Sequence, residues 1–429
     1  MTTDYRNIAP ASSPRPDRRR RGAGESATQA DGSASSAAAP LTGLRVLDLS
    51  RVLAGPYCTM MLADLGAEVI KVEHPAVGDE TRGWGPPFAG TEAAYFLAVN
   101  RSKRSVALDF KDPADRAAAL VLASRSDVVI QNFRAGAIER IGLGYDAVRA
   151  LRPDIVYCSL TGFGSDRDPP DRPGYDFIAQ AECGLMQITG AEQPTKVGVA
   201  LVDVLTGMNA AVGILAALRR RDQTGAGEHV EVSLLDSALA ALVNVAQSAL
   251  LTGQEPSRFG NAHPNIVPYQ TFRAKDGWIA VAAANDGLYR RLCETIHYPQ
   301  LADDQRFITN ADRVHNRAAL IELLNQRFIQ RSADEWVAAL DAAGVPAGKI
   351  RGVLEAFAAA HSAGRSATVT VSHPTAGELA LVASPIRLTE ASLRPPQSPP
   401  LLGEHTTEIL SKDRILRHAQ VPTPTDATS

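Results

Sequence analysis

The chain has 429 residues, of which 45% are hydrophobic and 21% charged, and its formal net charge is −3 at pH 7. This length predicts two or three domain-sized units, and the near-neutral charge argues against a nucleic-acid or acidic-lipid partner. Four widely separated cysteines without a C-x-x-C pair predict neither a disulfide framework nor a zinc site, and they favour a reducing cytoplasm. No apolar run approaches the roughly 20 residues of a membrane helix, so no membrane span is predicted.

Residues 1–40 differ in composition from the rest of the chain and predict a disordered tail. They are rich in Ala, Ser, Pro, Gly and Arg, with almost no large apolar side chains. No apolar core follows the basic run Arg18–Arg21, which argues against a secretory signal. Asp4, Asp17 and Glu25 argue against a transit peptide, because such peptides are poor in acids. We therefore interpret this segment as a solvated tail.

Strand-like and helix-like segments alternate through the first part of the chain. Short β-branched runs predict strands, and apolar residues at three and four residue steps predict helices. The predicted strands are 44–49, 68–73, 105–109, 127–132 and 154–160, and the predicted helices are 55–65, 112–124 and 135–151. This alternation predicts a parallel sheet covered by helices on both faces, a Rossmann-like α/β fold. Ligands of such sheets bind beyond the carboxyl ends of the strands.

The turns that follow these strands carry no glycine fingerprint. Neither G-x-G-x-x-G nor the Walker pattern occurs there, so a nicotinamide or P-loop nucleotide site loses its main support. Six cations lie around the second half of the predicted sheet, and guanidinium and ammonium groups suit phosphates. They are Arg101, Lys103, Arg104, Lys111, Arg134 and Arg140. The alternative is an ordinary solvated face, which spacing alone favours slightly.

A lone acid, Asp203, interrupts the apolar stretch 199–208 at the start of a predicted helix. Arg219–Arg221 and Gly225 are typical of the end of that helix. As a helix cap, Asp203 accepts a hydrogen bond from an early backbone N–H, which is the commoner use of an acid at this position. As a nucleophile, it uses the same donors and the helix dipole to stay ionised while its oxygens face a cleft. The stretch alone does not decide between the two interpretations.

The chain changes character after residue 251. Before that point Glu228–Ser233 predicts another strand, and Ser233 is placed to cap an apolar helix that runs to Leu251. Residues 269–284 predict a hairpin, helices are predicted at 286–298, 313–330 and from 332, and a strand pair is predicted around 368 and 379. We therefore predict a large domain at 41–251, completed by 366–415, and a smaller α+β domain at 252–365.

Six runs of sequence together resemble the class III CoA-transferases. Each run alone is a weak signal, but six in this order over residues 42–410 are highly specific. The runs are Leu47–Pro56, Leu62–Glu73, Gly78–Trp84, Asn100–Asp109, Gly174–Gln180 and Pro399–His405. The resemblance implies an enzyme that moves CoA between carboxylic acids, built as an interlocked homodimer of chains with a Rossmann-like large domain and a smaller α+β domain.

The family's nucleophilic aspartate precedes a helix that contains a Gly-Met pair, and the match falls on Asp203 rather than Asp176. The resemblance implies that Asp203 forms a mixed anhydride with the donor acyl group and then carries CoA as a thioester. N–H donors must stabilise the oxyanions that form. The family's glycine-containing lid loop matches 258–263, which implies Gly260 and Asn261 at the lid. The CoA thioester is the substrate, and neither a metal nor a permanently bound cofactor is implied.

The CoA contacts of the family, carried over by position, fall mainly at the predicted strand ends. They are Leu53, Ala54, His74, Leu108, Asp109, Phe110, Lys111, Asn132, Phe133, Arg134, Arg140 and Asp176. Oxalate-using members have glutamine at the position of Leu53 and arginine at that of His74. Leu53 therefore argues against oxalate as the acceptor, whereas Arg140 is the strongest phosphate ligand among the matches.

The acceptor is predicted to be a dicarboxylate. Runs 79–88, 262–269 and 313–317 resemble the members that use succinyl-CoA and glutarate, which implies succinyl-CoA as the donor. The second carboxylate of the acceptor needs a bidentate arginine, for which Arg82 and Arg258 are candidates, with surface or ion-pair roles as the alternative. Racemising members use histidine where this chain has Tyr175, and a tyrosine is too weak a base near neutral pH. A racemase is thus the minor alternative, beside a non-catalytic nucleotide-binding protein.

Overall fold

The structure, a computed structural model, describes residues 38–165 and 172–413. Its main element is a six-stranded parallel sheet with the strand order β5-β2-β1-β6-β7-β8. The strands are β1 (Arg45–Asp48), β2 (Glu68–Glu73), β5 (Lys103–Ala107), β6 (Val128–Gln131), β7 (Val156–Thr161) and β8 (Glu228–Ser233). This sheet confirms the predicted α/β fold. The chain adds β2 and β5 on one side of β1 and then β6, β7 and β8 on the other, so the order of the strands reverses between β1 and β6, as in a doubly wound sheet. The tail predicted at 1–40 lies outside the described residues up to residue 37.

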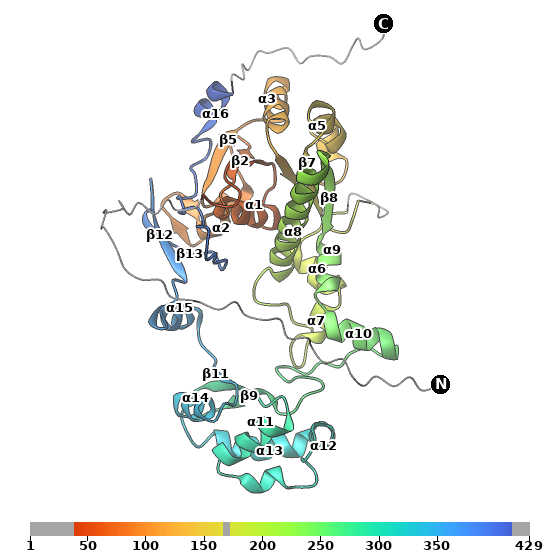
Figure 1. The fold of residues 1–429 in the computed structure, drawn as a ribbon, viewed down its shortest axis with the longest axis vertical. Helices are drawn as coiled ribbons and strands as arrows, with labels where there is room; N and C mark the ends of the chain where they lie inside the picture. The colour runs from red at the N-terminus through yellow and green to blue at the C-terminus, as the bar shows by residue number, and fades with distance from the viewer. Residues whose placement is uncertain (1–37, 166–171, 414–429) are drawn as a thin grey trace, which may run out of the picture. The chain divides into compact units, whose positions relative to one another are not determined.

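Apolar side chains on both faces of the sheet are buried, because helices cover both faces (Figure 1). In β1, Val46 belongs to the core on one face and Leu47 to the core on the other. This alternation is what a strand buried on both sides requires. The first core includes α1 (Ala54–Asp64) and α8 (Leu201–Thr224), and the second includes α3 (Pro113–Ser124), α5 (Tyr145–Leu151) and α16 (Thr406–Lys412).

Capping side chains explain several helix boundaries. Asp112 accepts the Ala114 N–H at the start of α3, and Ser233 accepts the Asp236 N–H at the start of α9. The shorter elements of this part of the chain are η1 (Glu80–Gly83), β3 (Phe88–Ala89), β4 (Glu92–Ala93), α2 (Ala94–Val99), α4 (Ala137–Arg140), α6 (Asp176–Glu182), α7 (Leu185–Ile188), α9 (Leu234–Ala240) and α10 (Val243–Thr252).

The prediction of a single apolar helix that runs from Ser233 to Leu251 is wrong. A bend of 78° separates α9 from α10. The break lies at residues 241–242, and Val243, the first residue of α10, has a φ of 34°, outside the right-handed helical region. Apolar periodicity continues across this break, which is why the sequence pattern alone predicts one helix.

The C-terminal segment returns to the edge of the main sheet. After the antiparallel pair β12 (Thr368–His373) and β13 (Gly377–Val382), the backbone N–H of His405 donates to the Ser105 carbonyl of β5 at 2.9 Å. The Ala107 N–H donates to Thr406 Oγ1, also at 2.9 Å. α16 then adds Ile409 and Leu410 to the second core. The C-terminal segment thus completes the packing on this face of the sheet, together with residues from the first part of the chain.

A separate hydrophobic core lies within residues 267–345. Its three-stranded sheet has the order β11-β10-β9, and the predicted hairpin forms β9 and β10. The elements here are β9 (Tyr269–Arg273), β10 (Trp278–Ala282), α11 (Asp286–Thr295), η2 (Pro299–Ala302), α12 (Asn310–His315), α13 (Arg317–Phe328), α14 (Ala333–Ala342), β11 (Ala347–Lys349) and α15 (Val353–Ser362). The predicted bounds of the two domains stay predictions.

α8 is longer and more apolar than the sequence argument allowed. Among the described residues, α8 is the only unbroken helix that has the length and hydropathy of a membrane span. The prediction that no such apolar run exists is therefore wrong. It packs instead against α1 and the sheet, with Ala210, Ala211 and Ile214 buried in the first core. Its first turn carries Asp203.

Candidate active site

The turn after β1 is tied to the loop after β6 at the point where the strand order reverses. Asn132 Oδ1 accepts the Arg51 N–H at 2.9 Å, and Asn132 Nδ2 donates to the Arg51 carbonyl at 2.7 Å. Asp48 Oδ1 accepts the Ser50 N–H at 3.0 Å. Buried and loop side chains therefore fix this turn without a glycine-rich sequence, in the crevice where doubly wound sheets bind ligands.

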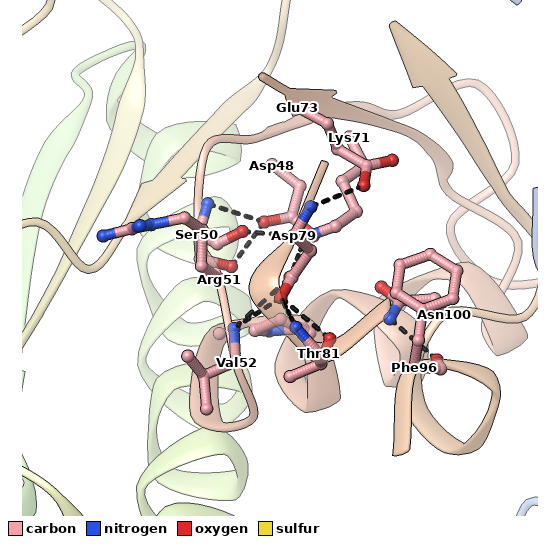
Figure 2. A network of polar contacts seen from close by, with 12 residues as sticks. Asp48, Ser50, Arg51, Val52, Lys71, Glu73, Asp79, Thr81, Phe96 and Asn100 are labelled. Atoms are coloured by element: carbon pink, nitrogen blue, oxygen red, sulfur yellow. Dashed lines mark hydrogen bonds and ion pairs between the residues drawn. The ribbon is translucent and has the colours of Figure 1, made fainter. Parts of the chain in front are cut away.

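A network of buried charges lies beneath this turn (Figure 2). Lys103 Nζ lies 3.1 Å from Asp48 Oδ2 and 2.9 Å from the Pro56 carbonyl oxygen. Burial lowers the pKa of Lys103 to about 8. Burial also opposes the charge of Asp48, but the nearby Lys103 and Lys71 outweigh it and lower the pKa of Asp48 to about 2. The network thus holds its charges in pairs, as buried ions require.

The N-terminus of α8 is capped by an acid from another helix. Asp176, the first residue of α6, accepts the N–H of Val202 at 2.8 Å and that of Asp203 at 3.3 Å. The Gln180 amide donates to the other Asp176 oxygen at 2.7 Å. The N-cap residue of α8, Ala200, supplies no side-chain cap. The capping role, one of the two interpretations of Asp203, therefore belongs to Asp176, and the Asp203 carboxylate is available for another function.

The Asp203 carboxyl group is more basic than an exposed aspartate. Burial raises its pKa to about 7, and the negative charge of Asp176 is the second cause. The sequence predicts that the N–H donors and the dipole at the start of the helix favour the ionised form, whereas burial acts in the opposite direction and raises the pKa. Burial, followed by the charge of Asp203, raises the pKa of Tyr95 to about 12. Perturbed acids of this kind are typical of functional sites.

Two adjoining cavities lie at the carboxyl edge of the sheet. The smaller has a volume of about 160 Å³, and Asp203 lines it together with the turn 51–54, the loop 132–135 and residues 172–175. The larger, about 550 Å³, runs past the carboxyl ends of β2 and β5. Arg51, Glu80 and Phe133 line both, so the two cavities meet at these side chains.

Eleven of the twelve CoA contacts predicted from the sequence line one of these cavities. The smaller cavity has Leu53, Ala54, Asn132 and Arg134, the larger has His74, Leu108, Asp109, Phe110, Lys111 and Arg140, and Phe133 lines both. Asp176 lines neither, and it reaches the site through the cap of α8. Within the described ranges Lys111, Arg134 and Arg140 form no ion pair, so three cations border the cavities without a carboxylate partner.

Arg82, a predicted acceptor ligand, does not line either cavity. Its guanidinium donates to both oxygens of Glu73 at 2.7 Å, and its Nη1 lies 3.0 Å from Glu92 Oε1. All three side chains are buried. Two buried carboxylates already bind the Arg82 guanidinium. Arg82 therefore has the ion-pair role that is the alternative to binding the acceptor.

The predicted lid residues Gly260 and Asn261, and Arg258 of the same loop, do not line either cavity. Arg258 donates to the backbone carbonyls of Gln187 and Glu192 at 2.9 and 2.8 Å. The Gly260 N–H donates to a backbone carbonyl of the same 187–192 segment, and Asn261 Nδ2 lies 3.3 Å from Thr271 Oγ1. The contacts of Arg258, Gly260 and Asn261 in the structure are thus with these segments and not with Asp203.

The sequence patterns do not single out two residues that line the cavities, Arg51 and Arg172. Arg51 lies in the turn that the strand-end rule indicates, so a signal for it existed. Arg172 lines the cavity of Asp203, lies over the Phe163 ring at 4.2 Å and pairs with Glu182 at 2.9 Å. Its position two residues before the Gly174-Tyr-Asp run was the available signal.

A carboxyl group of raised pKa, together with cations that have no carboxylate partner among the described residues, lies at the crevice of a doubly wound sheet. This arrangement is typical of α/β enzymes that bind anionic ligands. No group of three or more His, Cys, Asp or Glu side chains able to hold a metal occurs in residues 38–165 and 172–413. The chain belongs to CoA-transferase family III, whose family model matches residues 41–406.

Known proteins of this family resemble the chain over most of its length. It is 42% identical to the succinyl-CoA:glutarate CoA-transferase of Homo sapiens over 381 residues, which cover 88% of this chain and 86% of that protein. It is 39% identical to the succinate–glutarate CoA-transferase of Agrobacterium fabrum over 391 residues, 89% of this chain and 98% of that protein. The crystal structure of a CAIB/BAIF family protein from Brucella suis matches with a TM-score of 0.79 and 41% identity, covering 88% of this chain and 100% of the other. These matches confirm the predicted enzyme class.

Proposed function

We propose that this enzyme transfers CoA from succinyl-CoA to a dicarboxylic acid such as glutarate, with Asp203 as the nucleophile. Relatives named for succinyl-CoA, succinate and glutarate, at 42% and 39% identity, support the donor and the acceptor. One observation carries the role of Asp203. Its carboxylate lines the cavity at the crevice of the sheet, while the capping of its helix is done by Asp176.

The proposed reaction passes acyl and CoA groups over one carboxylate. Ionised Asp203 attacks the thioester carbonyl of succinyl-CoA, the C–S bond breaks, and a mixed anhydride and CoA thiolate form. The thiolate attacks the aspartyl carbonyl, which releases succinate and leaves an aspartyl-CoA thioester. The acceptor carboxylate attacks the aspartyl carbonyl of this thioester, its C–S bond breaks, and a second mixed anhydride and CoA thiolate form. The thiolate then attacks the acceptor's carbonyl carbon in the anhydride, and the C–O bond to Asp203 breaks. This step gives the new acyl-CoA and returns Asp203 as a carboxylate. No net proton is consumed, and at every stage one acyl carbon, that of the donor, of Asp203 or of the acceptor, stays activated as a thioester or an anhydride.

The two cavities suit the two parts of the donor. The pKa of about 7 makes ionised Asp203 a stronger nucleophile than an exposed aspartate, and burial keeps water from stabilising its charge. We assign the acyl group to the smaller cavity and the nucleotide end of CoA to the larger one. Lys111 and Arg140 border the larger cavity without a carboxylate partner in the described part of the chain, which supports a phosphate-binding role.

We propose Arg172 as the ligand of the acceptor's far carboxylate, in place of Arg82 and Arg258. Arg172 and Asp203 line the same cavity, and an incoming carboxylate can exchange with the partly exposed Glu182. Arg172→Lys loses the bidentate geometry, so we expect KM for glutarate to rise by ~10-fold or more. Transfer to a monocarboxylate such as butyrate should change little. An equal loss with butyrate would contradict the assignment, and Arg149→Lys on the surface of α5 is the matched control.

We also propose that the enzyme is a homodimer that works in a reducing cytoplasm. Large apolar side chains are exposed on α8, at Met208 and Val212, and on α10, where Leu250 and Leu251 are 80% and 77% exposed. All four cysteines are free and buried, which supports the reducing compartment. Light scattering should give twice the chain mass of 45.6 kDa, and the mass of one chain would contradict the dimer.

The central test is exchange of CoA between succinyl-CoA and a panel of carboxylic acids. Asp203→Asn should lower kcat by more than ~10³-fold while the protein stays folded, because the nucleophile is lost. Asp222→Asn, an exposed acid of the same helix, is the control. Mass spectrometry should find a CoA adduct on the peptide with Asp203 in the wild type only. Full activity of Asp203→Asn would contradict the proposed mechanism.

Two further measurements address the alternatives to CoA transfer. Deuterium wash-in at Cα of a 2-methylacyl-CoA, without any acceptor acid, would indicate a racemase. Calorimetric binding of NAD together with no exchange from any acyl-CoA would indicate a nucleotide-binding protein.

A further inference from the structure

The turn between β1 and α1 contains a strained residue. Val52 has a backbone φ of 71°, in the left-handed region. A Cβ disfavours this region, and a β-branched side chain disfavours it most, whereas glycine enters it freely. The local sequence therefore does not favour this conformation, and contacts from outside the turn must maintain it.

A buried carboxylate supplies these contacts. Asp79 Oδ2 accepts the Val52 N–H at 3.3 Å, and Asp79 is 1% exposed. The Thr81 N–H and hydroxyl donate to Asp79 Oδ1 at 3.0 and 2.8 Å. Lys71 Nζ lies 2.9 Å from Asp79 Oδ2 and donates to the Ser50 carbonyl at 2.8 Å. The Asp79–Lys71 pair thus holds the turn at two points (Figure 2).

The turn forms one wall of the cavity that Asp203 lines. Val52, Leu53 and Ala54 all border this cavity. α1 begins at Ala54 and touches α8 one turn after Asp203, where a Cβ on Gly207 would lie 2.6 Å from the Ala54 carbonyl oxygen. Because the two helices are in contact there, the conformation of the turn determines how Leu53 and Ala54 face Asp203.

We propose that Asp79 is a positioning residue for CoA transfer. With Lys71 it holds Val52 in the left-handed conformation and so sets the cavity wall opposite the nucleophile. Asp79 borders the larger cavity but is almost fully buried, so it acts through the turn and not by contact with the substrate. The inference rests on the proposed role of Asp203.

The test compares two variants alone and combined. Asp79→Ala removes the hold on the turn, so we expect kcat to fall by ~10- to ~100-fold with KM for succinyl-CoA changed less than ~3-fold. Val52→Gly removes the conformational cost of the turn, so adding it to Asp79→Ala should restore kcat by at least ~5-fold. Asp79→Asn keeps an oxygen for the Val52 N–H and should retain more kcat than Asp79→Ala.

Asp127→Ala is the matched control for a merely structural carboxylate. Asp127 accepts the Arg45 N–H at 2.8 Å and pairs with Arg152 at 2.8 Å, before β6 begins and hence at the opposite edge of the sheet. This variant should lower the melting temperature and leave kcat within ~2-fold, because it perturbs no residue of the cavities. Equal losses of kcat in Asp127→Ala and Asp79→Ala, or no rescue by Val52→Gly, would overturn the proposal.

A stability measurement separates this proposal from the proposed function. If the wild type transfers CoA to no acid, the proposed function fails, but the hold on the turn is still tested by thermal unfolding. Val52→Gly should raise the melting temperature of the wild type, where the turn is held in the left-handed region. It should not do so in Asp79→Ala, where the turn is free to leave that region. An equal rise in melting temperature in the wild type and in Asp79→Ala would contradict the proposal that Asp79 holds the turn.

Discussion

Replacing Asp176 by asparagine removes the negative charge beside Asp203 while keeping an oxygen that can accept the N–H groups at the start of α8. Asp203 must be ionised to attack a thioester, so kcat/KM falls as the pH drops through its pKa of about 7 in the free enzyme. Without the charge of Asp176, ionisation of Asp203 becomes easier. We expect the acid limb of the profile to move to lower pH in Asp176→Asn.

The size of this change is bounded by the structure. The pKa of Asp203 rises from 3.8 to about 7, an increase of about 3, and burial is the larger of the two causes. Asp176 therefore accounts for less than about 1.5 of the increase, or less than about 2 kcal/mol. The inflection should move from about pH 7 to a value no lower than about 5.5, because burial remains.

The measurement is kcat/KM for succinyl-CoA from about pH 5 to pH 9, with glutarate in excess, for folded protein only. Asp146→Asn, which removes an exposed acid from the first turn of α5, is the control and should keep the wild-type profile. An unchanged inflection in Asp176→Asn would refute the proximity argument. A fall to the ordinary value of an aspartate would refute burial as the main cause.

Two predictions concern stability. Arg82→Met removes the guanidinium that pairs with the buried Glu73 and Glu92 carboxylates and should cost about 3–5 kcal/mol in urea unfolding, whereas a loss below about 1 kcal/mol would contradict a structural ion pair. Asp48 has a pKa of about 2 in the folded protein against 3.8 as its ordinary value, so its stabilising contribution is complete above pH 3.8 and is lost as the pH falls towards 2. Asp48→Asn should lack this part of the acid dependence, about 2.5 kcal/mol, in unfolding measured against pH.

The strands and helices of the main sheet could be predicted because their signals are local. The predicted bounds of 68–73 and 228–233 match β2 and β8 to the residue. The short elements between 80 and 99 have no periodicity to find. Leu97 of α2 packs with Val371 and Leu381 of the C-terminal hairpin, so its burial depends on residues more than two hundred positions later.

The candidate site shows the same limit. The sequence places an acid at the start of α8, but the choice between cap and nucleophile depends on Asp176, which lies 27 residues away and caps the helix in its stead. Arg82 illustrates the opposite error. The resemblance predicts Arg82 as a candidate ligand of a second substrate carboxylate. In the structure Glu73 of β2 and Glu92 of β4 already bind its guanidinium.

The return of the C-terminal segment to β5 has a consequence for synthesis of the chain on the ribosome. β5 is an edge strand of the sheet, and residues 403–406 supply its outer contacts while α16 completes the second core. When β8 has been translated, about 170 further residues, or about 10 to 30 s of elongation, separate the nascent sheet from its missing edge. Throughout that interval the strand edge is open to pairing with other chains. We expect premature stop codons near the 3′ end of the message to yield aggregating products that carry every residue of the active site.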